Sequence, residues 1–120
     1  MQTSYFAISS NLPNAVSIAA KPPDFYRGRE YLPLAPTWQI YSEYKRTKNV
    51  HEYTERYACD ILATLDPEEV FEELGRYSLL LCWEAPDKFC HRRIVARWFE
   101  DNLNVSVPEL TGGPNDYNIR

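Results

Sequence analysis

The sequence predicts an α/β domain with three layers, in which helices cover a small, mostly parallel sheet. Short apolar runs alternate with longer amphipathic segments along the 120 residues, which is the pattern of strands joined by crossover helices. Residues 77–83 (YSLLLCW) are almost continuously apolar, as expected of a strand that is covered on both faces. The length and the hydrophobic fraction of 44% suit one domain. We place it at residues 1–110 and expect the polar residues 111–120 to be a flexible tail.

Four strands are expected. Residues 4–9 (SYFAIS) and 15–20 (AVSIAA) are short apolar runs separated by turn-forming Asn and Pro. The chain from 21 to 36 is rich in Pro, Tyr and Arg and is expected to be a loop. Residues 77–83 form the central strand. Residues 104–108 (NVSVP) are expected to add a short parallel strand, reached by a right-handed crossover.

The remaining segments have the apolar spacing of helices. We expect helices at residues 38–48, with Thr37 as the N-cap, and at residues 50–65. A third begins after Asp66, where an N-cap residue is followed by Pro and two Glu. The last is expected at 89–102, and its apolar residues form one broad face.

Composition excludes several classes of protein. The net charge is −4 and the isoelectric point about 5.2, so the chain lacks the basic excess of most nucleic-acid-binding proteins. No run approaches the roughly 18 apolar residues of a membrane span, and the first residues do not resemble a signal peptide. The cysteines are three in number, Cys59, Cys82 and Cys90. An odd count without a secretory signal favours reduced thiols and a cytoplasmic protein.

Chemically capable residues gather where the central strand ends and the last helix begins. Cys82 and Glu84 follow each other at strand spacing and would point to the same side. Cys90 and His91 are expected in the first helical turn, whose positive end favours a thiolate. Arg92 and the free backbone amides beside it suit a phosphate or a carboxylate. Open α/β sheets bind ligands at such junctions.

Each of these residues also has a structural interpretation. Cys82 could be a packed thiol, Glu84 a solvated acid or an ion-pair partner of Arg92, and His91 a packing residue. A zinc site could use Cys82, Cys90, His91 and Glu84, but the paired Cys-x2-Cys spacing of structural zinc sites is absent, so no metal is predicted. Glycine-rich phosphate loops are absent as well.

The junction resembles the family called domain of unknown function 488. The resemblance covers residues 4–103 and is most specific at Leu81, Cys82, Glu84, Cys90, His91 and Arg92. It implies a Rossmann-like α/β fold and a soluble prokaryotic or phage protein, but no activity. One departure follows the second strand. A basic residue, often Arg before Gly, is expected there, whereas this chain has Lys21 before Pro22.

The leading functional hypothesis is binding, and turnover if the chain is an enzyme, of a nucleotide-like or phosphorylated ligand in a cleft at this junction. The catalytic candidates are Glu84, Cys90, His91 and Cys82. The ligand-binding candidates are Ser9, Lys21, Tyr26, Arg27 and Arg92. The alternative is a non-enzymatic module that binds a protein or nucleic acid through the aromatic segment 22–57. The sequence identifies no cofactor and leaves the oligomeric state open.

Overall fold

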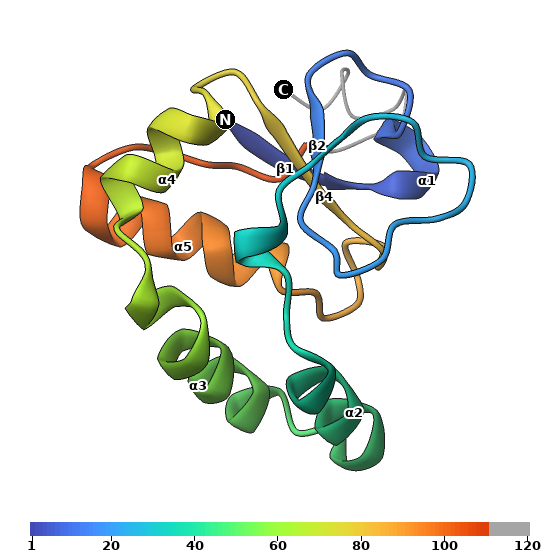
Figure 1. The fold of residues 1–120 in the computed structure, drawn as a ribbon, viewed down its shortest axis with the longest axis vertical. Coiled ribbons are helices and arrows are strands. Elements are labelled where there is room, and N and C mark those ends of the chain that lie inside the picture. The colour runs from blue at the N-terminus through green and yellow to red at the C-terminus, as the bar shows by residue number, and fades with distance from the viewer. Residues whose placement is uncertain (111–120) are drawn as a thin grey trace.

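Four parallel strands form one sheet in the order β1-β4-β2-β3 (Figure 1). The structure is a computed structural model, and it describes residues 1–110. The predicted flexible tail at 111–120 lies outside the described residues. The strand bounds are Gln2–Tyr5 for β1, Ala15–Ser17 for β2, Arg29–Glu30 for β3 and Leu79–Cys82 for β4.

β4 is the central strand, because it pairs with β1 on one side and with β2 on the other. All four of its residues are buried. Its side chains alternate between two cores: Leu80 belongs to one cluster, and Leu79 and Leu81 belong to the other. The continuous apolar run therefore reflects a strand covered on both faces, and the expected α/β class with a small parallel sheet is confirmed.

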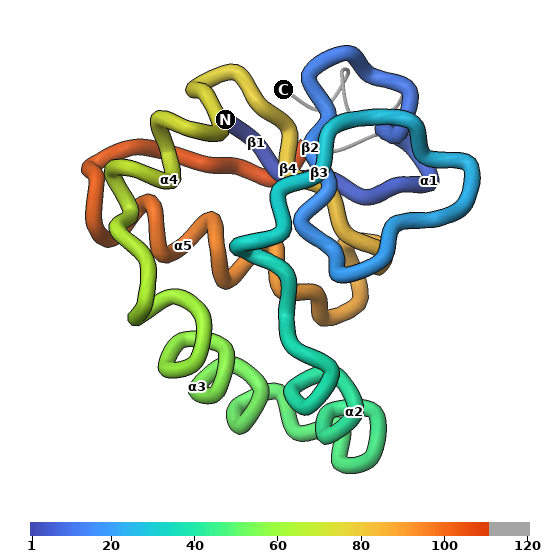
Figure 2. The backbone as a smooth tube through the Cα atoms, viewed as in Figure 1, coloured from blue at the N-terminus to red at the C-terminus, as the bar shows by residue number. Residues whose placement is uncertain are grey.

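The helices lie mainly on one side of the sheet, where α5 contacts β1 and β4, and α4 packs on α5. α2 and α3 pack on each other farther from the sheet. On the other face, α1 and the long β2–β3 connection cover the second core (Figure 2). The helix bounds are Phe6–Ser9 (α1), Trp38–Thr47 (α2), Val50–Asp60 (α3), Pro67–Leu74 (α4) and Arg92–Leu103 (α5), with 3-10 turns at Leu32–Leu34 and Leu62–Thr64.

Two of the predicted helix starts are confirmed by their caps. The Thr37 side chain accepts a hydrogen bond from the Ile40 amide at 3.2 Å. The Asp66 carboxylate accepts one from the Glu68 amide at 3.1 Å. In each case a side-chain oxygen satisfies an amide that has no partner within the helix. No helix among residues 1–110 has the length and apolar character needed to cross a membrane.

Three of the predicted strands are wrong in part or whole. The strand expected at 15–20 ends at Ser17. Residues 6–9 form α1 instead of extending β1, because β4 is four residues long and pairs only with residues 2–5. Residues 104–108 form no strand. Just after them, Glu109 forms an isolated parallel bridge with Thr3 of β1. Pro108 accepts a hydrogen bond from the Thr3 amide but has no amide of its own to donate. Conversely, β3 lies within the segment expected to be a loop.

Candidate functional site

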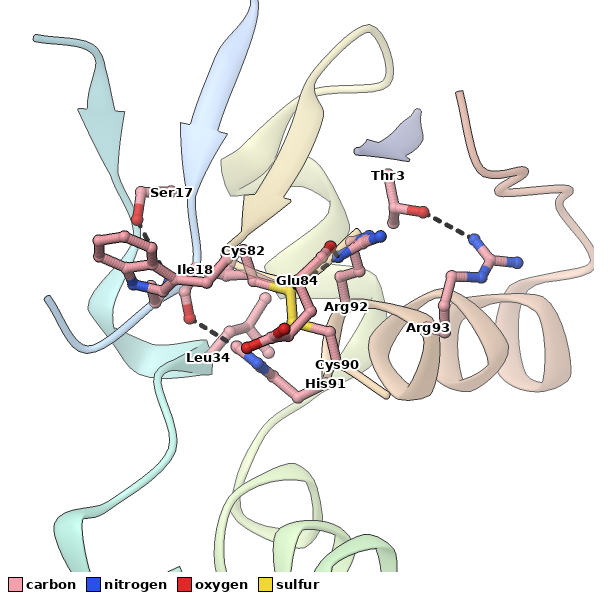
Figure 3. The surroundings of a disulfide bond; sticks show 12 residues. Thr3, Ser17, Ile18, Leu34, Cys82, Glu84, Cys90, His91, Arg92 and Arg93 are labelled. Carbon is pink, nitrogen blue, oxygen red and sulfur yellow. Dashed lines mark hydrogen bonds between the residues drawn. A yellow bond between two sulfur atoms is a disulfide. The ribbon is translucent and has the colours of Figure 1, made fainter. Parts of the chain in front are cut away.

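A disulfide joins Cys82 to Cys90 at the carboxyl end of β4 (Figure 3). Cys82 is the last residue of β4 and is 1% exposed. Cys90 is half-buried and lies just before α5. The expectation of reduced thiols is therefore wrong for these two, because the loop between them returns Cys90 to the strand end. Cys59 is free and exposed, as expected of its place in α3.

Arg92 is the first residue of α5, yet its side chain is only 1% exposed. Its Nε and NH2 groups donate to the carboxylate of Glu109 at 2.8 to 3.2 Å. Its NH1 group donates to the carbonyl oxygen of Glu84 at 2.7 Å and to the Sγ of Cys82 at 3.3 Å. The guanidinium that the sequence assigned to a ligand therefore binds groups of the protein itself.

Glu109 is the site residue that sequence reasoning missed. Its carboxylate also accepts a hydrogen bond from the Thr3 hydroxyl at 2.6 Å. The Thr3 hydroxyl in turn accepts one from Arg93 at 2.7 Å. No spacing rule connects an acidic residue near position 109 with a buried cation in α5. Its role becomes visible only in the fold, where Glu109 lies beside Thr3 of β1.

His91 is 5% exposed, and its Nε2 lies 2.8 Å from the carbonyl oxygen of Ile18. A carbonyl only accepts, so Nε2 carries the proton and Nδ1 keeps the lone pair. The ring meets the edge of Tyr57, with centroids 5.4 Å apart. Burial lowers the pKa of His91 to about 4, and the charge of Arg92 acts in the same direction against the Ile18 hydrogen bond. The imidazole is therefore neutral at pH 7.

The predicted start of the last helix is too early. α5 begins at Arg92, so Cys90 and His91 lie ahead of the first turn. The disulfide holds Cys90 to the strand end, and the Ile18 hydrogen bond holds the His91 ring to the segment after β2. Stabilisation of a Cys90 thiolate by amides of the first turn, as expected from sequence, therefore lacks its geometric basis.

Glu84 lies beyond the end of β4, which is at Cys82, so the strand alternation expected to pair the two side chains does not reach it. The residue is exposed, and among residues 1–110 its carboxylate has no hydrogen-bond partner. Its backbone carbonyl, by contrast, is fixed by Arg92. Trp83, which the sequence did not single out, donates from Nε1 to the carbonyl of Lys21 at 2.9 Å. That bond holds the β2–β3 connection beside the junction.

The other predicted ligand-binding residues are engaged elsewhere. Ser9 is buried and its hydroxyl bonds that of Ser4 at 2.7 Å. Tyr26 is buried and donates to the Arg29 carbonyl at 2.7 Å. Arg27 is exposed and donates to the Asp24 carbonyl at 2.6 Å. The Lys21 side chain is exposed. The hydrogen bonds of Ser9, Tyr26 and Arg27 therefore stay within their own segments.

A cavity of about 470 Å³ lies at the other end of the sheet, where β2, β3 and β4 begin. Its wall includes the turn before β2 and the segment between α4 and β4. Of the nine predicted site residues, Arg27 alone contributes to it. The cleft expected at the carboxyl ends of the strands is thus not where this cavity lies.

Comparisons with protein-family models, curated proteins and solved structures return no match. The resemblance to domain of unknown function 488 therefore stays a prediction from the sequence.

Proposed function

We propose that Cys82 and Cys90 form a reversible thiol–disulfide redox centre. The observation that supports this best is the hydrogen bond from the buried guanidinium of Arg92 to the Sγ of Cys82, at 3.3 Å. A cation beside a sulfur favours the thiolate over the thiol. Thiol–disulfide exchange requires one sulfur to leave as a thiolate, and the rate rises as that sulfur becomes more acidic.

The two sulfurs differ in exposure, which gives them different roles. Cys90 is half-buried, whereas Cys82 is fully buried. The thiolate of a partner dithiol attacks the Sγ of Cys90 and forms a mixed disulfide. The bond between Cys90 and Cys82 breaks, and its electron pair leaves on Cys82, where Arg92 stabilises it. The second thiolate of the partner then releases Cys90. The partner is oxidised by two electrons, and both cysteines take up protons from water.

A purely structural disulfide is the competing interpretation. The bond closes a loop with a sequence separation of 8, and chain-entropy reasoning gives about 2.5 kcal/mol of stabilisation for such a loop. A structural bond needs neither a preferred point of attack nor a cation beside one sulfur. A reduction potential within the range of thiol–disulfide buffers therefore distinguishes a redox centre from a structural disulfide.

Single-cysteine variants test the assigned roles. In a Cys59→Ser background, Cys82→Ser leaves Cys90 alone and Cys90→Ser leaves Cys82 alone. We expect Cys90 to form a mixed disulfide with oxidised glutathione at least about ten-fold faster than Cys82, because thiol reactivity requires access as well as a thiolate. Intact mass against time gives both rates. Equal rates, or faster modification of Cys82, would contradict the assignment.

Binding of a phosphorylated or nucleotide-like ligand at Arg92 stays a prediction. Its anion would have to replace the Glu109 carboxylate, which now forms the ion pair with Arg92 at 2.8 Å. The cytoplasmic location also stays a prediction. It is relevant here because disulfides of cytosolic proteins are usually transient and catalytic or redox-sensing.

The interaction module proposed for residues 22–57 likewise stays a prediction. Several large apolar side chains of that segment are exposed, and Trp38 is the most exposed of them at 73%. Trp38 and Tyr41 lie together, with ring centroids 5.7 Å apart. Exposed aromatic pairs of this kind are common on interaction surfaces, but no partner chemistry follows from them.

A further inference from the structure

The sulfurs of Cys82 and Cys90 and a ring nitrogen of His91 all lie within 4.8 Å of one another. We propose that, after the disulfide is reduced, these three atoms bind one divalent metal ion of the zinc class. This inference rests on the proposed function, because only the reduced cysteines can act as ligands. The sequence predicted no metal, since it showed no paired Cys-x2-Cys spacing. The fold instead brings together a strand end and the segment before α5.

The donor set has the chemistry of a zinc site. Thiolate sulfur and neutral imidazole nitrogen are the ligands that zinc prefers in proteins. Two cysteines and one histidine leave the fourth tetrahedral position for water or a substrate, as in catalytic sites, whereas structural sites use four protein ligands. The proposed ion would therefore be able to exchange ligands.

A hydrogen bond to Ile18 sets which nitrogen of His91 is free to bind a metal. Its Nε2 donates to the backbone carbonyl of Ile18 at 2.8 Å, which leaves the lone pair on Nδ1. Metal-binding histidines usually donate their other ring N–H to a carbonyl or carboxylate, and this contact fixes both the tautomer and the ring direction. Packing of the ring against Tyr57 restricts it further. The segment after β2 therefore fixes the tautomer of the proposed nitrogen ligand.

The charges around the site also balance. A divalent ion offsets two thiolates, and the neighbouring cation of Arg92 is offset by Glu109. Arg92 donates to the Sγ of Cys82, a contact that would supply a hydrogen bond to the ligating thiolate as well. Buried charges persist when they are paired and hydrogen-bonded. The ion would complete a neutral cluster.

Metal binding and disulfide formation exclude each other. A dithiol reductant supplies two electrons to the Cys82–Cys90 bond and becomes a disulfide, and the site gains two thiols. Binding of the ion then releases the two thiol protons. Oxidation by a disulfide reverses these steps and expels the ion. The site would therefore sense the thiol state of its surroundings through its metal content.

Cobalt is the probe for this site, because sulfur-to-cobalt charge transfer gives an absorption band that reports thiolate ligation. The Cys59→Ser protein is reduced with a phosphine, freed of reductant without oxygen, and assayed for thiols before Co²⁺ is added. We expect two thiols, one equivalent of bound cobalt with the charge-transfer band, and displacement by Zn²⁺. The oxidised protein should bind none.

Two variants show which residues bind the metal. His91→Gln should weaken cobalt binding by at least about ten-fold, whereas the matched control His51→Gln, at the exposed second histidine of the chain, should not. Cys90→Ser should abolish the charge-transfer band of a paired-thiolate site. This second variant tests the site independently if His91→Gln does not fold. Failure to generate two thiols overturns the proposed redox function. If two thiols form but cobalt does not bind stoichiometrically, only the metal site is overturned. The same holds if the affinity for cobalt is unchanged in His91→Gln and in Cys90→Ser.

Discussion

Replacing Arg92 by methionine should lower the free energy of unfolding by about 3–5 kcal/mol, the usual cost of removing one partner from a buried ion pair. The substitution keeps the long apolar stem but leaves Glu109, whose side chain is 16% exposed, without its cation. The Glu84 carbonyl and the Cys82 sulfur lose their donor as well. Urea unfolding followed by circular dichroism measures the loss.

Arg97 provides the matched control on the same helix. It forms an exposed ion pair with Asp101, and its side chain is 76% exposed. Arg97→Met should therefore cost less than about 1 kcal/mol. The double variant Arg92→Met with Glu109→Gln should recover part of the stability lost in the single variant, because the orphaned charge is gone. Equal losses for the Arg92 and Arg97 variants would show that the buried pair does not form in solution.

Acid should destabilise the protein through His91. The pKa is about 4 in the folded protein and about 6.5 in an unfolded chain. Between these values the unfolded chain binds a proton that the folded protein does not. The contribution of His91 to the free energy of unfolding is therefore fully present above about pH 6.5. It is lost as the pH falls through 4, by about 3 kcal/mol in total.

Urea unfolding at stepped pH measures this loss in three proteins. His91→Gln should show a shallower fall in stability between pH 6.5 and 4 than the parent protein, since the buried imidazole is gone. His51→Gln should keep the slope of the parent, because His51 is exposed and its ion-pair partner, Glu55 on α3, is exposed as well. Carboxylates contribute alike to all three, so the difference isolates His91. An unchanged slope in His91→Gln would show that its ring is accessible to protons in the folded state.

The sequence carried enough information for the parallel sheet but not for its edges. A run as apolar as the one around Leu80 has few alternatives to a central strand, and local side chains such as Asp66 set helix starts. Residues 6–9 are equally apolar, but a short apolar run fits a helical turn as well as a strand. Which one forms depends on the length of β4, a tertiary property. Likewise, whether residues 104–108 form a strand depends on how they pair with β1.

The candidate site was predictable where its residues are close in sequence. Cys82, Cys90, His91 and Arg92 meet at the junction as expected, since a strand end and the next helix must be joined by a short loop. The disulfide was not predicted, because spacing alone does not fix the direction of two side chains. The partners Glu109 and Ile18 were missed since they come from distant segments. Glu84 lies beyond the end of β4, and no local signal in the sequence marks that strand end.

The midpoint potential of the Cys82–Cys90 pair decides whether this disulfide is reversible. The Cys59→Ser protein is equilibrated in thiol–disulfide buffers of stepped ratio, its free thiols are alkylated, and the products are weighed by intact mass spectrometry. We expect one two-electron transition in which both cysteines become labelled together, at a potential above about −300 mV. A pair that stays oxidised in the most reducing buffers would be a structural bond, and a pair that never forms a disulfide would not be a redox centre. Either result would rule out a reversible redox role for Cys82 and Cys90.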